Sequence, residues 1–205
     1  MTTLSKPDIV KRIKTERRPS KVLVITPLLD PKSQIGDSSV DVRLGTEFIV
    51  LKQTNLATID PYDSQNAQQR IGRYQERVRV GFGEEFILHP NQLVLGSTLE
   101  YIAMPQNLTA RVDGRSSWGR LGLIIATASS IAPAFKGVVT LELINAGQSP
   151  LVLRPGIIIA QLVLSSVSRE VAYSGRYDFP TGPQFSRIHE DKDMAIWGER
   201  KNFIW

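Results

Sequence analysis

Short runs of apolar and β-branched residues, separated by Gly, Pro, Asn or Asp, dominate the chain from residue 21 onward. Runs of this kind are typical of β-strands. Almost no stretch repeats its apolar residues at helical spacing, so the pattern predicts a mostly β fold, a distorted β-barrel or a jelly-roll-like sandwich. The expected strands lie within residues 21–29, 40–51, 84–89, 92–104, 137–145, 151–164 and 169–174.

Residues 1–20 predict a single short helix at the N-terminus. Ser5 is a capping residue, Pro7 suits a first helical turn, and Asp8 adds negative charge at that end. Pro19 is expected to stop the helix, because proline lacks the N–H that the helix needs.

The chain is expected to form one domain over residues 1–205, because neither an internal repeat nor a linker interrupts it. Residues 52–83 are polar and rich in Gln, Arg and Asn, so we expect an excursion from the β body. The sequence 154–156, Arg-Pro-Gly, predicts a type II turn. Residues 192–205 hold two tryptophans and a phenylalanine, which we expect to pack on the body or on a neighbouring subunit.

Composition narrows the location and the class of partner. No apolar run approaches the roughly 20 residues of a membrane span, and the N-terminus lacks a signal-peptide core, so we expect a cytoplasmic protein without a membrane partner. The net charge of +5 is a mild basic excess. Its densest group, residues 11–21, carries no interleaved aromatics, which favours a small anion over a nucleic acid polymer.

The residues that bind metals or carry thiol chemistry are scarce. The chain has no cysteine, and its two histidines, His89 and His189, lie a hundred positions apart. This inventory excludes disulfides and sulfur-ligated metals, and it makes a zinc site improbable. We therefore expect no metal at the reacting centre.

The stretch DGRSSWGRLGL, residues 113–123, gathers two arginines, two serines and three glycines. Arg115 and Arg120 offer forked donors to phosphate oxygens, and Ser116 and Ser117 add hydroxyl and N–H groups. A turn with two solvated arginines has the same composition, so composition alone does not decide. The run leads straight into an apolar segment, and an anchored cationic loop favours an anion site.

Glu142 interrupts an otherwise apolar strand pattern. Alternation places it on one face with Val138, Thr140 and Ile144. A carboxylate in an apolar cavity has a raised pKa and can carry protons near neutral pH. Exposure to solvent, or pairing with an arginine, is equally compatible with the spacing.

The chain resembles the dCTP deaminase branch of the trimeric dUTPase superfamily in four segments that follow the family's order. They are VDVRLG (40–45), residues 87–123, residues 127–162 and SRI near residue 187. The resemblance covers most of the chain. It implies a dUTPase-type β fold, a homotrimer with active sites between subunits, and zinc-independent conversion of dCTP to dUTP and ammonia, with Mg²⁺ accompanying the triphosphate.

The resemblance also implies roles for individual residues. Glu142 stands where the deaminases keep the carboxylate that takes a proton from water and delivers one to the leaving amine. Ser116 and Arg120 stand where family members contact water and triphosphate, and Ala128 where a backbone carbonyl orients that water. A lid and tail are implied over residues 175–205. The full set of implied substrate-binding residues is Arg115, Ser116, Ser117, Arg120, Thr127, Ala128, Tyr173, Arg176 and Tyr177.

Two departures from the family pattern qualify these expectations. Ala132 replaces the aspartate that contacts the deoxyribose and that helps activate water in dUTPases. The lid glutamine is also missing, and Pro180 and Thr181 stand at the nearest positions. We therefore expect weaker sugar discrimination and altered closure over the triphosphate.

Three functions remain open from the sequence. The leading hypothesis is a dCTP deaminase, which is a hydrolase of nucleotide metabolism. The second is a bifunctional deaminase and dUTPase that releases dUMP; Gln161 and the Ser129-Ser130 pair favour it, and Ala132 opposes it. The third is a trimeric nucleotide-binding or regulatory protein without catalysis.

Overall fold

A computed structural model describes residues 2–18, 20–52, 72–126, 130–171, 175, 177 and 179–190. The helices are α1 (Lys6–Lys14), α2 (Pro31–Gln34), α4 (Ser116–Gly119) and the 3₁₀ turn η1 (Ile188–Glu190). The strands are β1 (Val24–Thr26), β2 (Ser39–Arg43), β3 (Glu47–Leu51), β4 (Gln75–Arg79), β5 (Phe86–Leu88), β6 (Leu93–Ser97), β7 (Tyr101–Ala103), β8 (Leu108–Gly114), β9 (Leu123–Ile125), β10 (Ser130–Ile131), β11 (Lys136–Gly137), β12 (Thr140–Asn145), β13 (Leu151–Leu153) and β14 (Ile158–Ser166).

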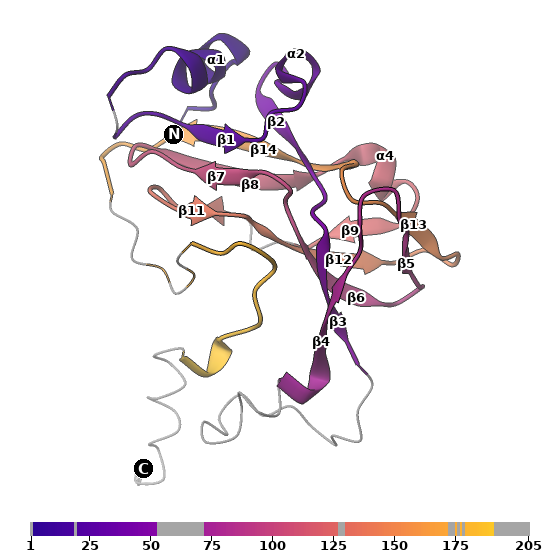
Figure 1. Cartoon of the computed structure of the whole chain (residues 1–205). Helices are drawn as coiled ribbons and strands as arrows, with labels where there is room; N and C mark the ends of the chain where they lie inside the picture. The colour runs from indigo at the N-terminus through magenta and orange to yellow at the C-terminus, as the bar shows by residue number, and fades with distance from the viewer. Residues whose placement is uncertain are drawn as a thin grey trace, which may run out of the picture.

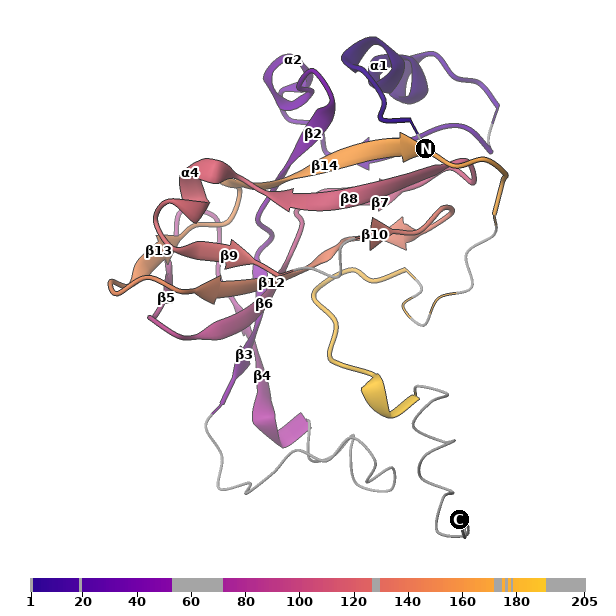
Figure 2. The same cartoon turned by 180° about the vertical axis from the view of Figure 1, so that it is seen from behind.

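The described strands form four antiparallel groups. Their orders are β1-β7-β11, β10-β8-β14-β2, β4-β3-β6-β12-β9 and β13-β5. α1 and α2 lie together at one end of the molecule, beyond β1, β2 and β14 (Figures 1 and 2). Strand β12 is paired on both sides, with β6 and β9, which makes it an internal strand of the five-stranded sheet.

The core lies between the four- and five-stranded sheets and is built from alternating strand residues. The four-stranded sheet contributes the fully buried Val40, Val42, Leu162 and Leu164, and the five-stranded sheet contributes the fully buried Phe48. The Phe48 ring stacks on Phe86 with centroids 4.3 Å apart. Each such side chain contributes roughly 1.5–3 kcal/mol through burial, so the two sheets form a stable platform for the segments between them.

The mostly β fold and the N-terminal helix are confirmed, and α1 begins after Ser5 as expected. The helix ends at Lys14, so the expectation that Pro19 stops it is wrong. The 154–156 turn is also confirmed, because Ile157 N donates to Arg154 O and Gly156 has φ +88°. The barrel expectation needs correction, since the described strands form separate open groups and not a closed barrel.

Three local expectations also differ from the structure. Residues 169–171 are not strand, although 169–174 has β-rich composition, because no neighbouring strand pairs with them in the described part of the chain. Within the expected polar excursion 52–83, Gln75–Arg79 forms β4 and pairs with β3. The long strand β8 was not anticipated, because Arg111, Asp113 and Gly114 within it have low strand propensity.

Candidate active site

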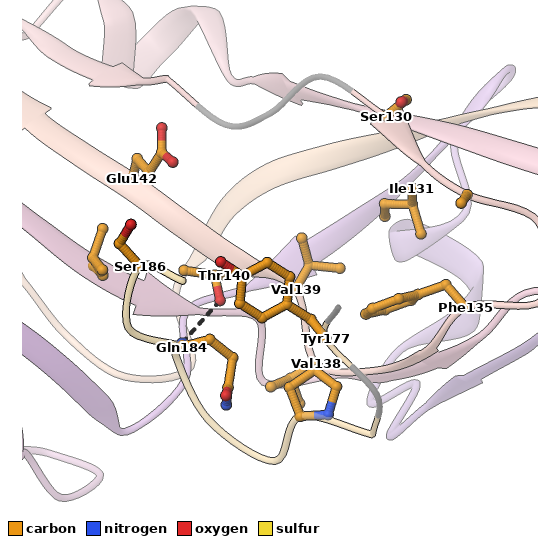
Figure 3. A pocket seen from close by; sticks show the side chains of 13 residues that line it. Ser130, Ile131, Phe135, Val138, Val139, Thr140, Glu142, Tyr177, Gln184 and Ser186 are labelled. Carbon is orange, nitrogen blue, oxygen red and sulfur yellow. Dashed lines mark hydrogen bonds between the residues drawn. The ribbon is translucent and has the colours of Figure 1, made fainter. Parts of the chain in front are cut away.

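Glu142 lines a cavity of about 360 Å³ beside strand β12. Figure 3 shows Glu142 and Thr140 along this strand, with Ser130, Ile131 and Phe135 on one side and the C-terminal segment on the other. The described residues that line the cavity are Leu95, Ser130, Ile131, Ala132, Phe135, Val138, Val139, Thr140, Glu142, Tyr177, Pro180, Gln184 and Ser186. Most of these are apolar, so a carboxylate here meets little compensating polarity.

The strand alternation explains why Glu142 points into this cavity. Leu141 and Leu143 are fully buried in the core, whereas Thr140, Glu142 and Ile144 on the opposite face are half-buried. Burial removes water from the carboxylate and raises the pKa of Glu142. No cation or hydrogen-bond donor among the described residues offsets this cost. The group is therefore suited to hold and release a proton nearer neutral pH.

The C-terminal segment closes one side of the cavity. Val138 N donates to Pro180 O at 2.8 Å, and Gln184 N donates to the Thr140 hydroxyl oxygen at 3.1 Å. Tyr177, which was predicted to bind substrate, lines the same cavity as Glu142. These bonds tie the segment to strand β12 and to the residues just before it.

The opposite wall contains the first departure from the family pattern. Ala132, where the resemblance implies an aspartate, lines the cavity and forms an apolar patch with Ile131 and Phe135. Ala134, in the same turn, has φ +61°, a left-handed conformation that favours glycine. Met104 N donates to Phe135 O at 2.8 Å, which fixes this wall, and Ala132 gives the wall no charged side chain.

Arg115, Ser116, Ser117 and Arg120 form a second cluster, around α4. Ser116, Ser117 and Arg120 are exposed, and Arg115 is half-buried against Asp41, with which it forms an ion pair. Trp118 fixes the short helix by donating from Nε1 to Ile158 O at 2.9 Å. The stretch is thus anchored on the core, as predicted, and its donors face solvent.

Within one chain, the two clusters do not meet. Arg115, Ser116 and Arg120 are not among the described residues that line the Glu142 cavity. The connection after α4 packs beyond the Asn145 end of β12, where Ala146 N donates to Gly122 O at 2.8 Å. The cavity lies at the opposite end, near Thr140. Of the other predicted site residues, Thr127, Ala128, Tyr173 and Arg176 lie outside the described residues.

Several residues near the two clusters were not predicted. Gln184 and Ser186 line the Glu142 cavity, and Asp41 pairs with Arg115. The only sequence signals were indirect: Asp41 lies in VDVRLG, and Ser186 begins SRI. Neither motif states which side chain the residue will contact.

Neither a metal-binding cluster nor a membrane-spanning helix occurs among the described residues. No group of three His, Asp or Glu side chains lies close enough there to hold a metal ion. None of the helices in that part of the chain has the length and apolar character that a transmembrane helix needs.

The fold and the cavity define a mostly β protein with a half-buried carboxylate, of raised pKa, in an apolar pocket. A family model described as "dCTP deaminase-like" matches residues 3–167, so the chain belongs to the dCTP deaminase-like family. Over 179 residues the chain is 41% identical to a protein of Halorubrum lacusprofundi named "dCTP deaminase", covering 84% of this chain and 86% of that protein.

A second relative is similar in sequence, and a solved structure is similar in fold. A protein of Halobacterium salinarum named "dCTP deaminase, dUMP-forming" is 40% identical over 180 residues, covering 84% of this chain and 90% of that protein. The crystal structure of 2′-deoxycytidine 5′-triphosphate deaminase from Agrobacterium tumefaciens matches with a TM-score of 0.58 and 20% identity. It covers 79% of this chain and 46% of the solved chain, and this likeness concerns the fold alone.

Proposed function

We propose that this chain is a dCTP deaminase, a hydrolase that converts dCTP and water to dUTP and ammonia. The observation that carries the proposal is the half-buried Glu142 carboxylate in an apolar cavity, with its pKa raised by loss of water. Family membership and the names of the curated relatives support the substrate class.

In the proposed mechanism, Glu142 serves both proton transfers. Its carboxylate takes a proton from water as the oxygen attacks C4 of cytosine, and the proton then passes to the exocyclic amine. The C4–N bond breaks, ammonia leaves, and the C4–oxygen bond becomes the uracil carbonyl as its remaining proton passes to ring N3. One group can serve both steps because its pKa is tuned toward the working pH.

Phosphate binding is assigned to the α4 cluster and the C-terminal segment. Arg115 and Arg120 can form charge-assisted hydrogen bonds to phosphate oxygens, and the exposed Ser116 and Ser117 can add donors. We assign Ser116 and Arg120 a further part beside the reacting water. The remaining substrate contacts are assigned to Thr127, Ala128, Tyr173, Arg176 and Tyr177.

We further propose a homotrimer in which α4 of one protomer completes the Glu142 cavity of the next. The separation of the two clusters within one chain supports this arrangement. Co-expression of equal amounts of Arg120→Ala and Glu142→Gln chains tests it, because random assembly would restore about a quarter of all sites, one in each mixed trimer. Recovery of that activity is expected; an inactive mixture, with trimers present, would contradict shared sites.

Magnesium enters the proposal as the counter-ion of the triphosphate. The described residues offer no three-residue acidic or histidine cluster, so a protein-held metal does not fit them. Mg²⁺ prefers substrate phosphates and water, with few protein ligands. We therefore derive no proton-transfer step from a metal, and the proposal includes no zinc. We keep the cytoplasmic location as part of the proposal because the substrate is a free nucleotide.

The direct test incubates the purified chain with dCTP and Mg²⁺ and measures ammonia and dUTP. Wild-type turnover is expected, with loss of about 10²-fold or more in Glu142→Gln. Glu85→Gln is the matched control, because Glu85 pairs with Arg154 in an exposed ion pair outside both clusters. If the wild-type chain releases no ammonia from any cytosine nucleotide, the proposed function is wrong.

A second candidate is the dUMP-forming reaction, in which the triphosphate is also hydrolysed. The Halobacterium salinarum relative supports it. The apolar wall at Ala132 opposes it, because no carboxylate is supplied there to activate a second water. Equal amounts of pyrophosphate and ammonia in the same assay would favour this candidate, whereas dUTP accumulation would exclude it.

A further inference from the structure

We propose that Asp41 is a positioning residue, which holds the guanidinium of Arg115 in the orientation that receives a substrate phosphate; this inference rests on the proposed function. Asp41 Oδ2 accepts a hydrogen bond from Arg115 Nη1, although the two residues lie 74 positions apart. Among the described residues, Asp41 is the only side chain that pairs with Arg115. No other described side chain engages the remaining guanidinium N–H groups of Arg115.

Asp41 is itself held on a fixed strand. The backbone carbonyl of Asp41 accepts from Gln34 Nε2 at 2.9 Å, and the same amide nitrogen donates to Glu100 Oε1 at 2.8 Å. Two residues on, Arg43 N donates to Glu100 Oε2 at 2.8 Å. Gln34 and Glu100 are fully buried. Strand β2 is therefore held at Asp41 and two residues beyond it, and the Asp41 carboxylate is a stable point of attachment.

The sheet register explains why Asp41, and not a nearer acid, is the partner. Gln161 on β14 lies opposite Asp41 on one side and Asp113 on the other. Asp113 is already paired, because Arg111 Nε donates to it at 2.7 Å along the same strand. Arg115, two residues beyond Asp113, reaches across the sheet to the remaining carboxylate.

Fixing Arg115 should help binding more than the Asp41 charge harms it. An unrestrained arginine loses rotamer freedom equivalent to roughly thirtyfold in affinity when it is immobilised. A phosphate that binds beyond the guanidinium lies farther from Asp41 than from Arg115, so its attraction to the cation exceeds its repulsion from the carboxylate. The Asp41 side chain is 15% exposed and that of Arg115 is 38% exposed, so the contact is partly shielded from solvent.

The test is a double-mutant cycle on Asp41 and Arg115 with dCTP and Mg²⁺. Asp41→Asn is expected to raise KM about tenfold with kcat within about twofold, whereas it should change nothing further in an Arg115→Gln background. Asp113→Asn, which removes a carboxylate paired with Arg111 on the same sheet face, is the matched control and should leave KM unchanged. An Asp41→Asn effect of equal size in both backgrounds, an unchanged KM, or a lower KM would overturn the inference.

A binding readout separates this inference from the proposed function. Calorimetric titration of dCTP into the Glu142→Gln chain, with and without Asp41→Asn, should show about tenfold weaker binding in the double variant. This result is independent of turnover, so an inactive wild-type chain would reject the proposed chemistry and leave the Asp41 measurement readable. Equal affinities in the two chains would reject the role of Asp41.

Discussion

Gly137 and Pro180 are in direct contact, and the contact depends on the missing side chain of glycine. A Cβ at Gly137 would lie 2.3 Å from Pro180 Cδ, and Gly137 has φ +146°. The glycine therefore lets the C-terminal segment lie against the residues that precede β12. This close approach sets one wall of the Glu142 cavity.

Gly137→Ala is expected to displace the C-terminal segment. The added methyl cannot be accommodated without moving Pro180, so Tyr177 and Gln184 lose their places beside Glu142. We expect kcat/KM for dCTP to fall about tenfold or more, because small misplacements at a reacting centre are costly. Faster tryptic cleavage at Arg187 would report the displacement directly.

The control for this substitution is Gly83→Ala. Gly83 also has a positive φ, +88°, but no atom lies within 4 Å of its added Cβ. It should lose about 1 kcal/mol of stability with kcat/KM unchanged. Equal losses of activity in both variants would mean that backbone strain, and not contact with Pro180, explains the effect.

Glu142→Gln is expected to stabilise the fold near neutral pH. Burial raises the pKa of Glu142, so the folded state binds a proton more tightly than the unfolded state. Wild-type stability therefore falls as pH rises through the window between the unfolded pKa, about 4.3, and the higher folded pKa. The stability of Glu142→Gln does not fall in this window, because glutamine does not ionise.

Melting temperatures measured from pH 3.5 to pH 8 test this linkage. The two chains should melt alike at the acid end, and the variant should melt higher at pH 8, by an amount on the order of 2 °C. A wild-type chain that gains stability relative to the variant as pH rises would show that the carboxylate is stabilised in the fold by a partner.

Ala134→Gly is expected to raise the free energy of unfolding by about 1 kcal/mol, because Ala134 has φ +61°. Ala146→Gly is the control, since Ala146 follows β12 without a positive φ, and the variant should lose stability through a more flexible unfolded chain. Urea denaturation of both variants gives the comparison. A loss of stability in Ala134→Gly would indicate that the alanine methyl makes a packing contact worth more than the strain.

Glu100→Ala should cost about 3–5 kcal/mol. Its removal leaves Arg43 without its buried ion pair and leaves the amide of Gln34 with one acceptor fewer. The exposed pair of Glu85 and Arg154 provides the contrast, because Glu85→Gln should cost less than about 1 kcal/mol. Similar denaturation midpoints for the two variants would contradict the structural role of Glu100.

The sequence predicted the surroundings of Glu142 well because alternation along a strand is a local property. Leu141 and Leu143 point into the core and Glu142 points away from it, as the pattern requires. The type II turn at 154–156 was predictable for the same reason, since proline and glycine act on their own backbone.

Features that depend on pairing between segments far apart in the sequence could not be predicted from local patterns. Strand β8 carries Arg111, Asp113 and Gly114, which are poor strand residues, and it forms because β14 and β10 pair with it on both sides. Residues 169–171 have suitable composition but find no such partner in the described part of the chain. The separation of Arg115 from Glu142 likewise follows from tertiary packing, which no motif encodes.

Strand β12, held by ladders to β6 and β9, is among the segments that should open last in native-state hydrogen exchange. The four residues of α4 have no such protection on their exposed side. Under the proposed function, substitutions in the weakly protected α4 turn can change which anion is bound, while the proton carrier stays on a segment that rarely unfolds.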